Sequence, residues 1–114
     1  MIRATTPKHS FTFDVNPEET FSEILITYAQ NGEIVLEKHK SDLTFESCDC
    51  FGGKTVYTAS IKLTQEETKL FSAKPKGIVS IQVRALTENG DAIASDIEQI
   101  SVQNVLNDEV LTCD

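Results

Sequence analysis

Apolar and polar residues alternate along several stretches of the chain with the period of two that is typical of β-strands. The clearest stretch is Ile78–Leu86, in which every second residue is apolar. One face of this segment consists of Val79, Ile81, Val83 and Ala85, and the other of Ser80, Gln82 and Arg84. This pattern predicts a strand with one buried face and one solvated face.

Three further segments are predicted to be strands. Phe11, Phe13 and Val15 alternate with polar residues, and Phe21–Gln30 carries apolar side chains on both faces. A strand that is apolar on both faces is expected in the middle of a sheet. In Thr55–Leu63 the two faces are formed by Val56, Thr58, Ser60 and Lys62 on one side and by Tyr57, Ala59, Ile61 and Leu63 on the other.

Two Asn-Gly pairs predict tight reversals of the chain. Asn31-Gly32 separates Ile24–Gln30 from Glu33–Lys38, and Asn89-Gly90 follows Ile78–Glu88. Asn-Gly favours the two-residue type I′ turn, because both central residues of that turn need positive φ. Each pair therefore predicts an antiparallel hairpin.

One short segment has a helical signature. Thr64-Gln65-Glu66-Glu67 matches a capping box, in which the Thr hydroxyl and the Glu carboxylate each accept from a backbone amide of the first turn. We expect one or two helical turns around residues 64–71, with Leu70 and Phe71 packed on the core. Pro75 and Gly77 are expected to end them.

The last third of the chain contains a break in the period. Ile97 and Ile100 are three residues apart, which does not fit one face of a regular strand. A β-bulge near Glu98-Gln99 would restore the register. Residues 107–114 show no clear period.

Together these elements predict an all-β protein. Seven to eight strands with frequent turns and no βαβ alternation favour an immunoglobulin-like antiparallel β-sandwich with one short helical turn. A small closed barrel is the alternative architecture. We assign residues 1–10 to an N-terminal arm, 11–106 to the sandwich and 107–114 to a C-terminal tail.

The charge balance narrows the classes of partner. Ten Lys and Arg against 18 Asp and Glu give a net charge of −8. Nucleic acids need a basic surface that neutralises phosphates, and anionic membranes attract basic segments, so neither is an expected partner. From residue 85 onward the chain has no Lys or Arg. The acidic residues there are a solvated face or a docking surface for a basic partner.

The cysteines and the N-terminal residues indicate the compartment in which the protein is made. Cys48, Cys50 and Cys113 are odd in number and too few for the disulfide framework of a small secreted domain. We therefore expect reduced thiols. Residues 1–7 have no apolar run of signal-peptide length, and no segment has the length of a membrane span, so we expect synthesis in the cytoplasm.

Candidate catalytic and metal-binding groups are few. Cys48 and Cys50 form half of a soft-metal site, and a second half would need His39 and Cys113 nearby. His9 and His39 lie in no catalytic motif and are expected to be exposed. Calcium could be bound only by scattered acids, without EF-hand spacing: Asp42, Glu46, Asp49, Asp91 and Asp96. We predict no enzymatic activity, cofactor, metal or small-molecule substrate.

Several segments resemble a known group of proteins. They are Met1–Phe13, Ile26–Lys38, Ile61–Phe71, Ile81–Ile97 and Asn107–Leu111. Together they resemble small, largely uncharacterised proteins encoded among the structural genes of tailed phages and prophages of Gram-positive gut bacteria. The pattern is also similar to the N-terminal sandwich domain of phage baseplate upper proteins. Glu46–Lys54, with its Cys-Asp-Cys, departs from the shorter loop expected there.

The resemblance implies a virion protein of the tail or baseplate that assembles with itself or with other virion proteins. Isolated apolar residues near the two termini are the candidate partner-binding residues, namely Ile2, Val105, Leu106, Val110 and Leu111. Two alternatives remain at this point. They are a phage-encoded regulator or anti-defence protein that binds a host protein, and a capsid decoration protein.

Overall fold

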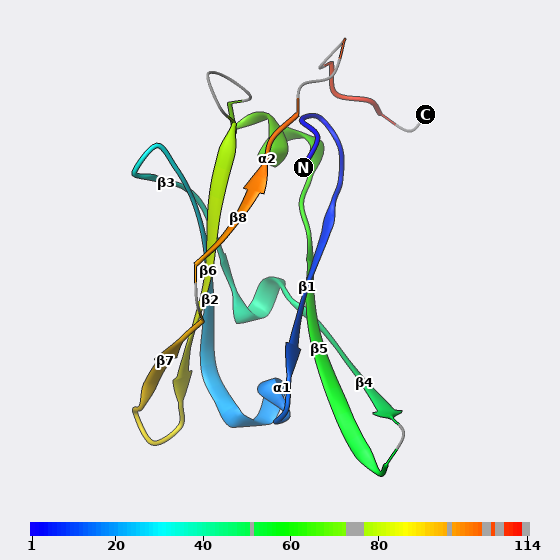
Figure 1. The fold of residues 1–114 in the computed structure, drawn as a ribbon, viewed down its shortest axis with the longest axis vertical. Helices are drawn as coiled ribbons and strands as arrows, with labels where there is room; N and C mark the ends of the chain where they lie inside the picture. The colour runs from blue at the N-terminus through cyan, green and yellow to red at the C-terminus, as the bar shows by residue number, and fades with distance from the viewer. Residues whose placement is uncertain (51, 73–76, 96, 104–105, 107–108, 113–114) are drawn as a thin grey trace.

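The computed structural model describes residues 1–50, 52–72, 77–95, 97–103, 106 and 109–112, with only the backbone of residue 50. The described elements are strands joined by short helical turns (Figure 1). In chain order they are β1 (Lys8–Phe13), α1 (Pro17–Thr20), β2 (Phe21–Gln30), β3 (Glu33–His39), a 3-10 turn (Lys40–Asp42), β4 (Thr44–Cys50), β5 (Lys54–Lys62), α2 (Gln65–Lys69), β6 (Ile78–Thr87), β7 (Ala92–Ala94) and β8 (Glu98–Ser101).

The strands form two antiparallel sheets. The smaller sheet has the order β1-β5-β4, and the larger has the order β3-β2-β6 with β7 and β8 both paired to β6. The chain changes sheet after β1, after β3 and after β5. Strands B, C, C′, D, E, F and G of an immunoglobulin-like sandwich pair in this same order, if β7 and β8 are taken as two halves of strand G. The predicted immunoglobulin-like sandwich is confirmed.

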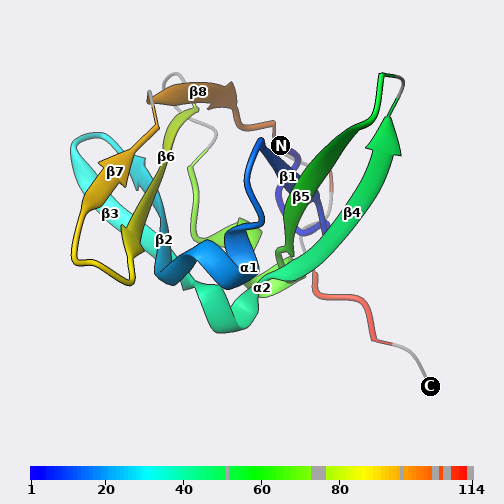
Figure 2. The ribbon, with the colours of Figure 1, turned by 90° about the horizontal axis from the view of Figure 1, so that it is seen from below.

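The core lies between the two sheets, which face each other in Figure 2. Its largest fully buried side chains include Tyr28, Ile24 and Ile26 of β2. The predicted apolar face of β6 is buried, and β2 lies between β3 and β6 as its apolar faces predicted. The ring of Tyr28 lies 6.0 Å from that of Phe71, so the segment after α2 closes one end of the core.

The first predicted hairpin is confirmed. Gln30 pairs with Glu33 across a two-residue loop in which Asn31 has φ 55° and Gly32 has φ 79°. Positive φ at both positions is the signature of the type I′ turn. Further along the hairpin the register shifts between Tyr28 and Ala29.

The second reversal is a hairpin, but the prediction of a two-residue turn was wrong. The Thr87 amide donates to the Asp91 carbonyl at 2.8 Å, and the Gly90 amide donates to the Thr87 carbonyl at 3.0 Å. The loop therefore has three residues, Glu88, Asn89 and Gly90, and among them positive φ occurs at Gly90 alone. A type I turn followed by one left-handed residue is the usual three-residue loop.

The predicted irregularity in the last strand exists at a different position. Arg84 pairs with Ala94 whereas Ile81 pairs with Glu98, so the outer strand has one extra residue between these two pairs. The register of β8 itself is regular through Glu98 and Gln99. The break thus lies before Glu98, where Ser95 Oγ replaces a backbone carbonyl by accepting from the Val83 amide at 3.0 Å.

The capping box at α2 is confirmed in both directions. Thr64 Oγ1 accepts from the Glu67 amide at 3.1 Å, and Glu67 Oε1 accepts from the Thr64 amide at 2.9 Å. Phe71 is buried as predicted, but the prediction for Leu70 was wrong because its side chain is 58% exposed. The helix ends after Lys69, before the chain turns back to the core, and Leu70 faces away. Of the predicted helix-ending residues, Pro75 lies outside the described residues, and Gly77 precedes β6.

The N-terminal segment is part of the sandwich. Strand β1 begins at Lys8, within the segment assigned to an arm, and ends at Phe13, so Val15 lies beyond it and is exposed. Residues 1–3 run parallel to residues 101–103. The Met1 ammonium donates to the Ser101 carbonyl, and the Arg3 amide donates to the Gln103 carbonyl. The prediction of a separate arm was therefore wrong for residues 1–3 and 8–10.

Candidate functional site

Strand β1 is the end strand of the smaller sheet and pairs with β5 on one side. The pairing places Lys8 opposite Lys62, so Pro7 lies opposite Leu63. The Leu63 amide donates to the Pro7 carbonyl at 3.0 Å. Hydrogen-bonded and non-hydrogen-bonded pairs alternate along an antiparallel ladder. The amides and carbonyls of His9, Phe11 and Phe13 consequently point to β5.

The remaining residues of β1 direct their backbone groups the other way. Lys8, Ser10 and Thr12 occupy the non-hydrogen-bonded positions, so their amides and carbonyls point away from β5. No strand among the described residues pairs with β1 on that side. The strand thus presents an unpaired edge with alternating donors and acceptors, a template for another extended chain.

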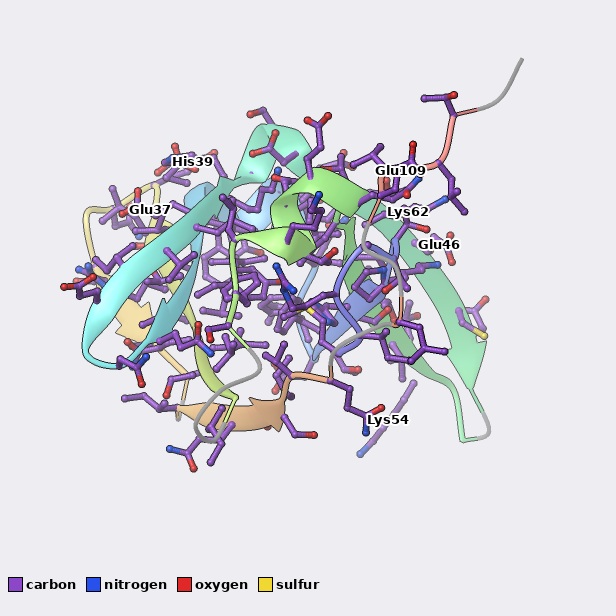
Figure 3. The ribbon with its side chains drawn as sticks, turned by 90° about the horizontal axis from the view of Figure 1, so that it is seen from above. Glu37, His39, Glu46, Lys54, Lys62 and Glu109 are labelled. Atoms are coloured by element: carbon purple, nitrogen blue, oxygen red, sulfur yellow. The ribbon has the colours of Figure 1, made fainter. Side chains whose placement is uncertain are left out.

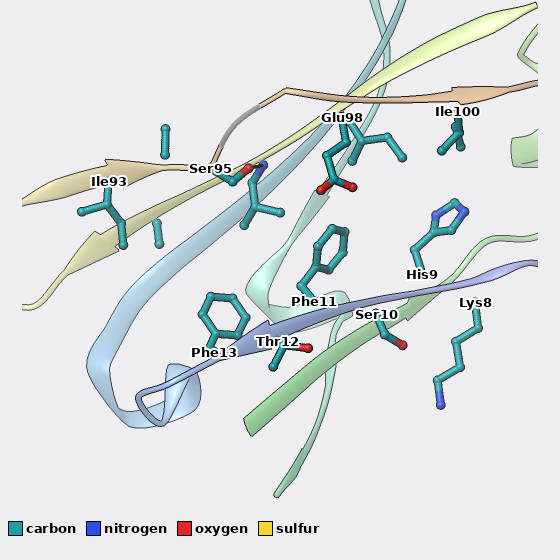
Figure 4. Close-up of a pocket in the computed structure, with 14 residues that line it drawn as sticks. Lys8, His9, Ser10, Phe11, Thr12, Phe13, Ile93, Ser95, Glu98 and Ile100 are labelled. Carbon is teal, nitrogen blue, oxygen red and sulfur yellow. Dashed lines mark hydrogen bonds between the residues drawn. The ribbon is translucent and has the colours of Figure 1, made fainter. Parts of the chain in front are cut away.

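An apolar groove of about 630 Å³ lies between this edge and the outer strands of the larger sheet. Figure 4 shows His9, Phe11 and Phe13 pointing into the groove from β1, whereas Lys8, Ser10 and Thr12 point away from it. The opposite wall is formed by Val83 and Ala85 of β6, Ile93 of β7 and Ile100 of β8. The groove therefore continues the core outward to solvent, and it would bury the apolar face of an added strand.

The wall of the groove opposite β1 is partly covered by residues 1–3 of the chain. Val102 donates to the carbonyl of Gly77, so the backbone of Ser101 points outward from β8. The Met1 ammonium meets the Ser101 carbonyl at 2.7 Å. On β7, the Ser95 amide bonds to the Val83 carbonyl at 2.8 Å, which places the backbone of Ala94 outward. Residues 1–3 thus cover the end of β8, and β1 is the longer uncovered edge beside the groove.

The edge of β1 differs in charge from the end strands β3 and β4. Strand β3 contains Glu33, Glu37 and Lys38 and a bulge, and β4 contains Glu46 and Asp49. Figure 3 shows Glu37 and Glu46 on the outside of the sheets. Charges and bulges discourage pairing of sheet edges. On β1, by contrast, Lys8 at the first position is the only formally charged residue, and positions 9–13 carry none at neutral pH.

His9 is the titratable residue of β1 inside the groove. Its Nδ1 lies 2.7 Å from the Tyr28 hydroxyl, and the two rings are 5.6 Å apart. Burial holds the pKa of His9 below its usual 6.5, and burial together with the charge of Glu67 raises the pKa of Tyr28. The neutral imidazole is thus favoured here, and the prediction that His9 is exposed was wrong.

The polar side chains around the groove bond to neighbouring groups of the sandwich. His9 Nδ1 contacts Tyr28, and Ser95 Oγ accepts from the Val83 amide. Glu98 also lines the groove. Cys48, whose side chain is the described one among the cysteines, does not line it.

His39 is exposed as predicted and lies at the end of β3. Its Nδ1 is 3.7 Å from Glu23 Oε1. The pKa of Glu23 lies below its usual value, because its carboxylate accepts from the amides of Lys40 and Ile24, with a smaller contribution from His39. This cluster stabilises the turn between β3 and β4, and Glu23 and Lys40 line a smaller hollow of about 450 Å³.

Four of the five predicted partner-binding residues lie in the described parts of the chain. Ile2 pairs with Gln103 beside β8 and is 44% exposed. Leu106 and Leu111 are exposed, and Val110 is partly buried. The backbone of Leu111 is held by the side chain of Gln65 in α2. Val105 lies outside the described residues. The sequence pattern missed the edge of β1, because which side of a strand is left unpaired depends on the order of strands in the sheet.

The predicted metal-ligand residues either bond to other groups, lie exposed on a strand, or fall outside the described residues. Cys48 is exposed on β4, Cys113 lies outside the described residues, and nothing is described of the side chain of residue 50. Asp42 caps the 3-10 turn by accepting from the His39 amide, and Asp49 accepts from the Thr55 hydroxyl. Asp96 lies outside the described residues. Within the described parts of the chain, no three His, Cys, Asp or Glu side chains gather as a metal site would require.

Comparisons with known proteins give no family for this chain. The sequence matches no model of a known protein family, and it matches none of the curated proteins. Among the described residues, no helix has the length and apolar character that crossing a lipid bilayer requires.

Proposed function

We propose that this protein is a non-enzymatic assembly module whose β1 edge binds an extended segment of another protein molecule. The single observation that carries the proposal is the coincidence of an unpaired strand edge with an apolar groove of about 630 Å³ beside it. Main-chain hydrogen bonds to a sheet edge provide affinity, and pockets for alternate side chains provide specificity.

The proposal includes a role in a phage particle, as a part of the tail or baseplate. This step rests on the resemblance of the sequence to phage structural proteins. An acidic sandwich with a pairable edge suits such a role, because virion parts act through repeated contacts between subunits. A regulator that binds a host protein and a capsid decoration protein remain the alternatives for the same edge.

The test uses particles produced by a phage or prophage that encodes the chain. Mass spectrometry of purified particles is expected to detect the protein, and labelling is expected to place it at the tail. The variant Ser10→Pro removes an amide that points away from β5, and it is expected to reduce incorporation. Ser47→Pro makes the same change on β4 and is the matched control.

Each other outcome has a defined meaning for the proposal. A protein made during infection but absent from mature particles would contradict the virion role and favour the regulator. Density on the head would favour the decoration protein. Equal incorporation of the Ser10→Pro and Ser47→Pro variants would show that the β1 edge is not the assembly surface.

A further inference from the structure

We infer that the extended segment bound at β1 is strand β1 of a second copy of this chain, paired antiparallel around a twofold axis. This inference rests on the proposed function, because it names the partner of the same edge. It would join the two smaller sheets into one continuous sheet. A twofold contact needs a surface that is complementary to itself, and β1 has three properties that meet this condition.

The first property is the hydrogen-bonding pattern. The outward amides and carbonyls belong to Lys8, Ser10 and Thr12. Two such strands can pair only in registers that place these positions opposite one another. Ser10 opposite Thr12 of the second copy satisfies this rule, and symmetry repeats the pair with the two copies exchanged.

The second property is charge complementarity. In this register Lys8 lies opposite Asp14 of the second copy, the residue that directly follows β1, and both residues are exposed. Opposite charges in directly facing positions stabilise a pair of strands, and like charges destabilise it. The neighbouring symmetric registers place Lys8 opposite Thr12 or opposite Asn16 and lose this ion pair. Each copy carries a net charge of −8, so balanced charge at the contact is needed to offset repulsion between the copies.

The third property is the apolar centre. The same register places Phe11 opposite Phe11 of the second copy on the twofold axis, at a non-hydrogen-bonded position where facing side chains are closest. Phe11 is partly buried and lines the groove. The two grooves would then meet along the contact, and each copy would cover part of the other's exposed apolar wall.

The experiment measures the dimerisation constant of the full chain by sedimentation equilibrium. Wild-type protein is expected to form a reversible dimer. Ser10→Pro removes one hydrogen bond in each half of the contact and is expected to weaken the dimer by at least about 30-fold. Ser47→Pro is expected to leave the dimer unchanged, because the Ser47 amide lies at the opposite edge of the sheet. Circular dichroism checks that both variants fold.

Charge reversal tests the register and does not depend on the proline variants. Lys8→Glu and Asp14→Lys are each expected to weaken the dimer about tenfold, because each places like charges opposite one another. The double variant K8E/D14K restores both pairs and is expected to return the constant to near the wild-type value. Single variants without effect, or a double variant weaker than either single one, would overturn the register.

The outcomes separate this inference from the proposed function. A chain that stays monomeric at all concentrations overturns the inference. If that monomer still enters particles and depends on an intact β1 edge to do so, the proposed function stands with a different protein as the partner. A dimer that Ser10→Pro and Ser47→Pro affect equally overturns the inference as well.

Discussion

Two glutamine side chains in this protein bind the backbone amide and carbonyl of one residue in the same way. Gln30 is buried, whereas Gln65 is half-buried and its bonds are exposed to solvent, and the contrast yields a quantitative prediction. Gln30, only 8% exposed, donates from Nε2 to the Ser72 carbonyl at 2.6 Å, and its Oε1 accepts from the Ser72 amide at 2.7 Å. Gln65 makes the same pair of bonds to Leu111, at 2.8 and 2.7 Å.

We expect Gln30→Leu to lower the free energy of unfolding by about 2 kcal/mol, because it removes two hydrogen bonds that each contribute about 1 kcal/mol. Leucine fills the buried space, so the loss reports on the bonds and not on a cavity. Gln65→Leu removes the same two bonds where water replaces them, and it is expected to change stability by less than about 0.5 kcal/mol.

Urea unfolding followed by circular dichroism measures both variants under the same conditions. Gln30→Glu is the control for the donor, since it keeps the acceptor for the Ser72 amide but places an anion against the Ser72 carbonyl. It is expected to be at least as unstable as Gln30→Leu. Equal unfolding free energies for Gln30→Leu and Gln65→Leu would refute the reasoning that burial decides the value of this contact.

Three further predictions concern the core, the second hairpin and pH. Phe71→Ala is expected to lower the free energy of unfolding by about 3–5 kcal/mol, and Leu70→Ala by less than about 0.5 kcal/mol, because Phe71 is buried and Leu70 is exposed. Urea unfolding of both variants measures the two losses. Losses of similar size would contradict the finding that Phe71 is buried and Leu70 is not. Gly90→Ala is expected to cost about 1 kcal/mol or more, because Gly90 has φ 90°, whereas Asn89→Ala is expected to be neutral. A melting temperature lowered as much by Asn89→Ala as by Gly90→Ala would favour a two-residue type I′ loop, in which both residues have positive φ. The pKa of His9 is lower in the folded protein than the ordinary 6.5, so the unfolded chain binds the proton more tightly. The contribution of His9 to unfolding free energy therefore falls as pH drops from about 6.5 through the folded-state pKa, and the variant His9→Gln should lack this dependence.

Much of the fold could be predicted from local pattern. The alternation in Ile78–Leu86 identified the buried face of β6, and Asn31-Gly32 identified the first hairpin, because both signals depend on residues close together in the chain. The capping box at Thr64–Glu67 is equally local. These features follow from backbone geometry and side-chain chemistry within a few residues.

The misplaced features depend on more distant contacts. Leu70 and Phe71 are both apolar, and only the direction in which the chain leaves α2 decides which of them meets Tyr28. Asn89-Gly90 differs from Asn31-Gly32 because β7 pairs with β6 in a register that leaves three residues in the loop. The candidate site shows this most clearly. The sequence of β1 does not reveal that no described strand pairs with its outer edge, which is a property of the sheet order.

Amide hydrogen exchange, resolved by residue with NMR at low and at high protein concentration, tests the role of β1 most directly. At low concentration the amides of His9, Phe11 and Phe13 should be protected by β5, and those of Ser10 and Thr12 should exchange rapidly. At high concentration Ser10 and Thr12 should become protected, while the amide of Ser47 at the other edge should not. Exchange at Ser10 and Thr12 that is independent of concentration, or protection that rises equally at Ser47, would contradict pairing through β1.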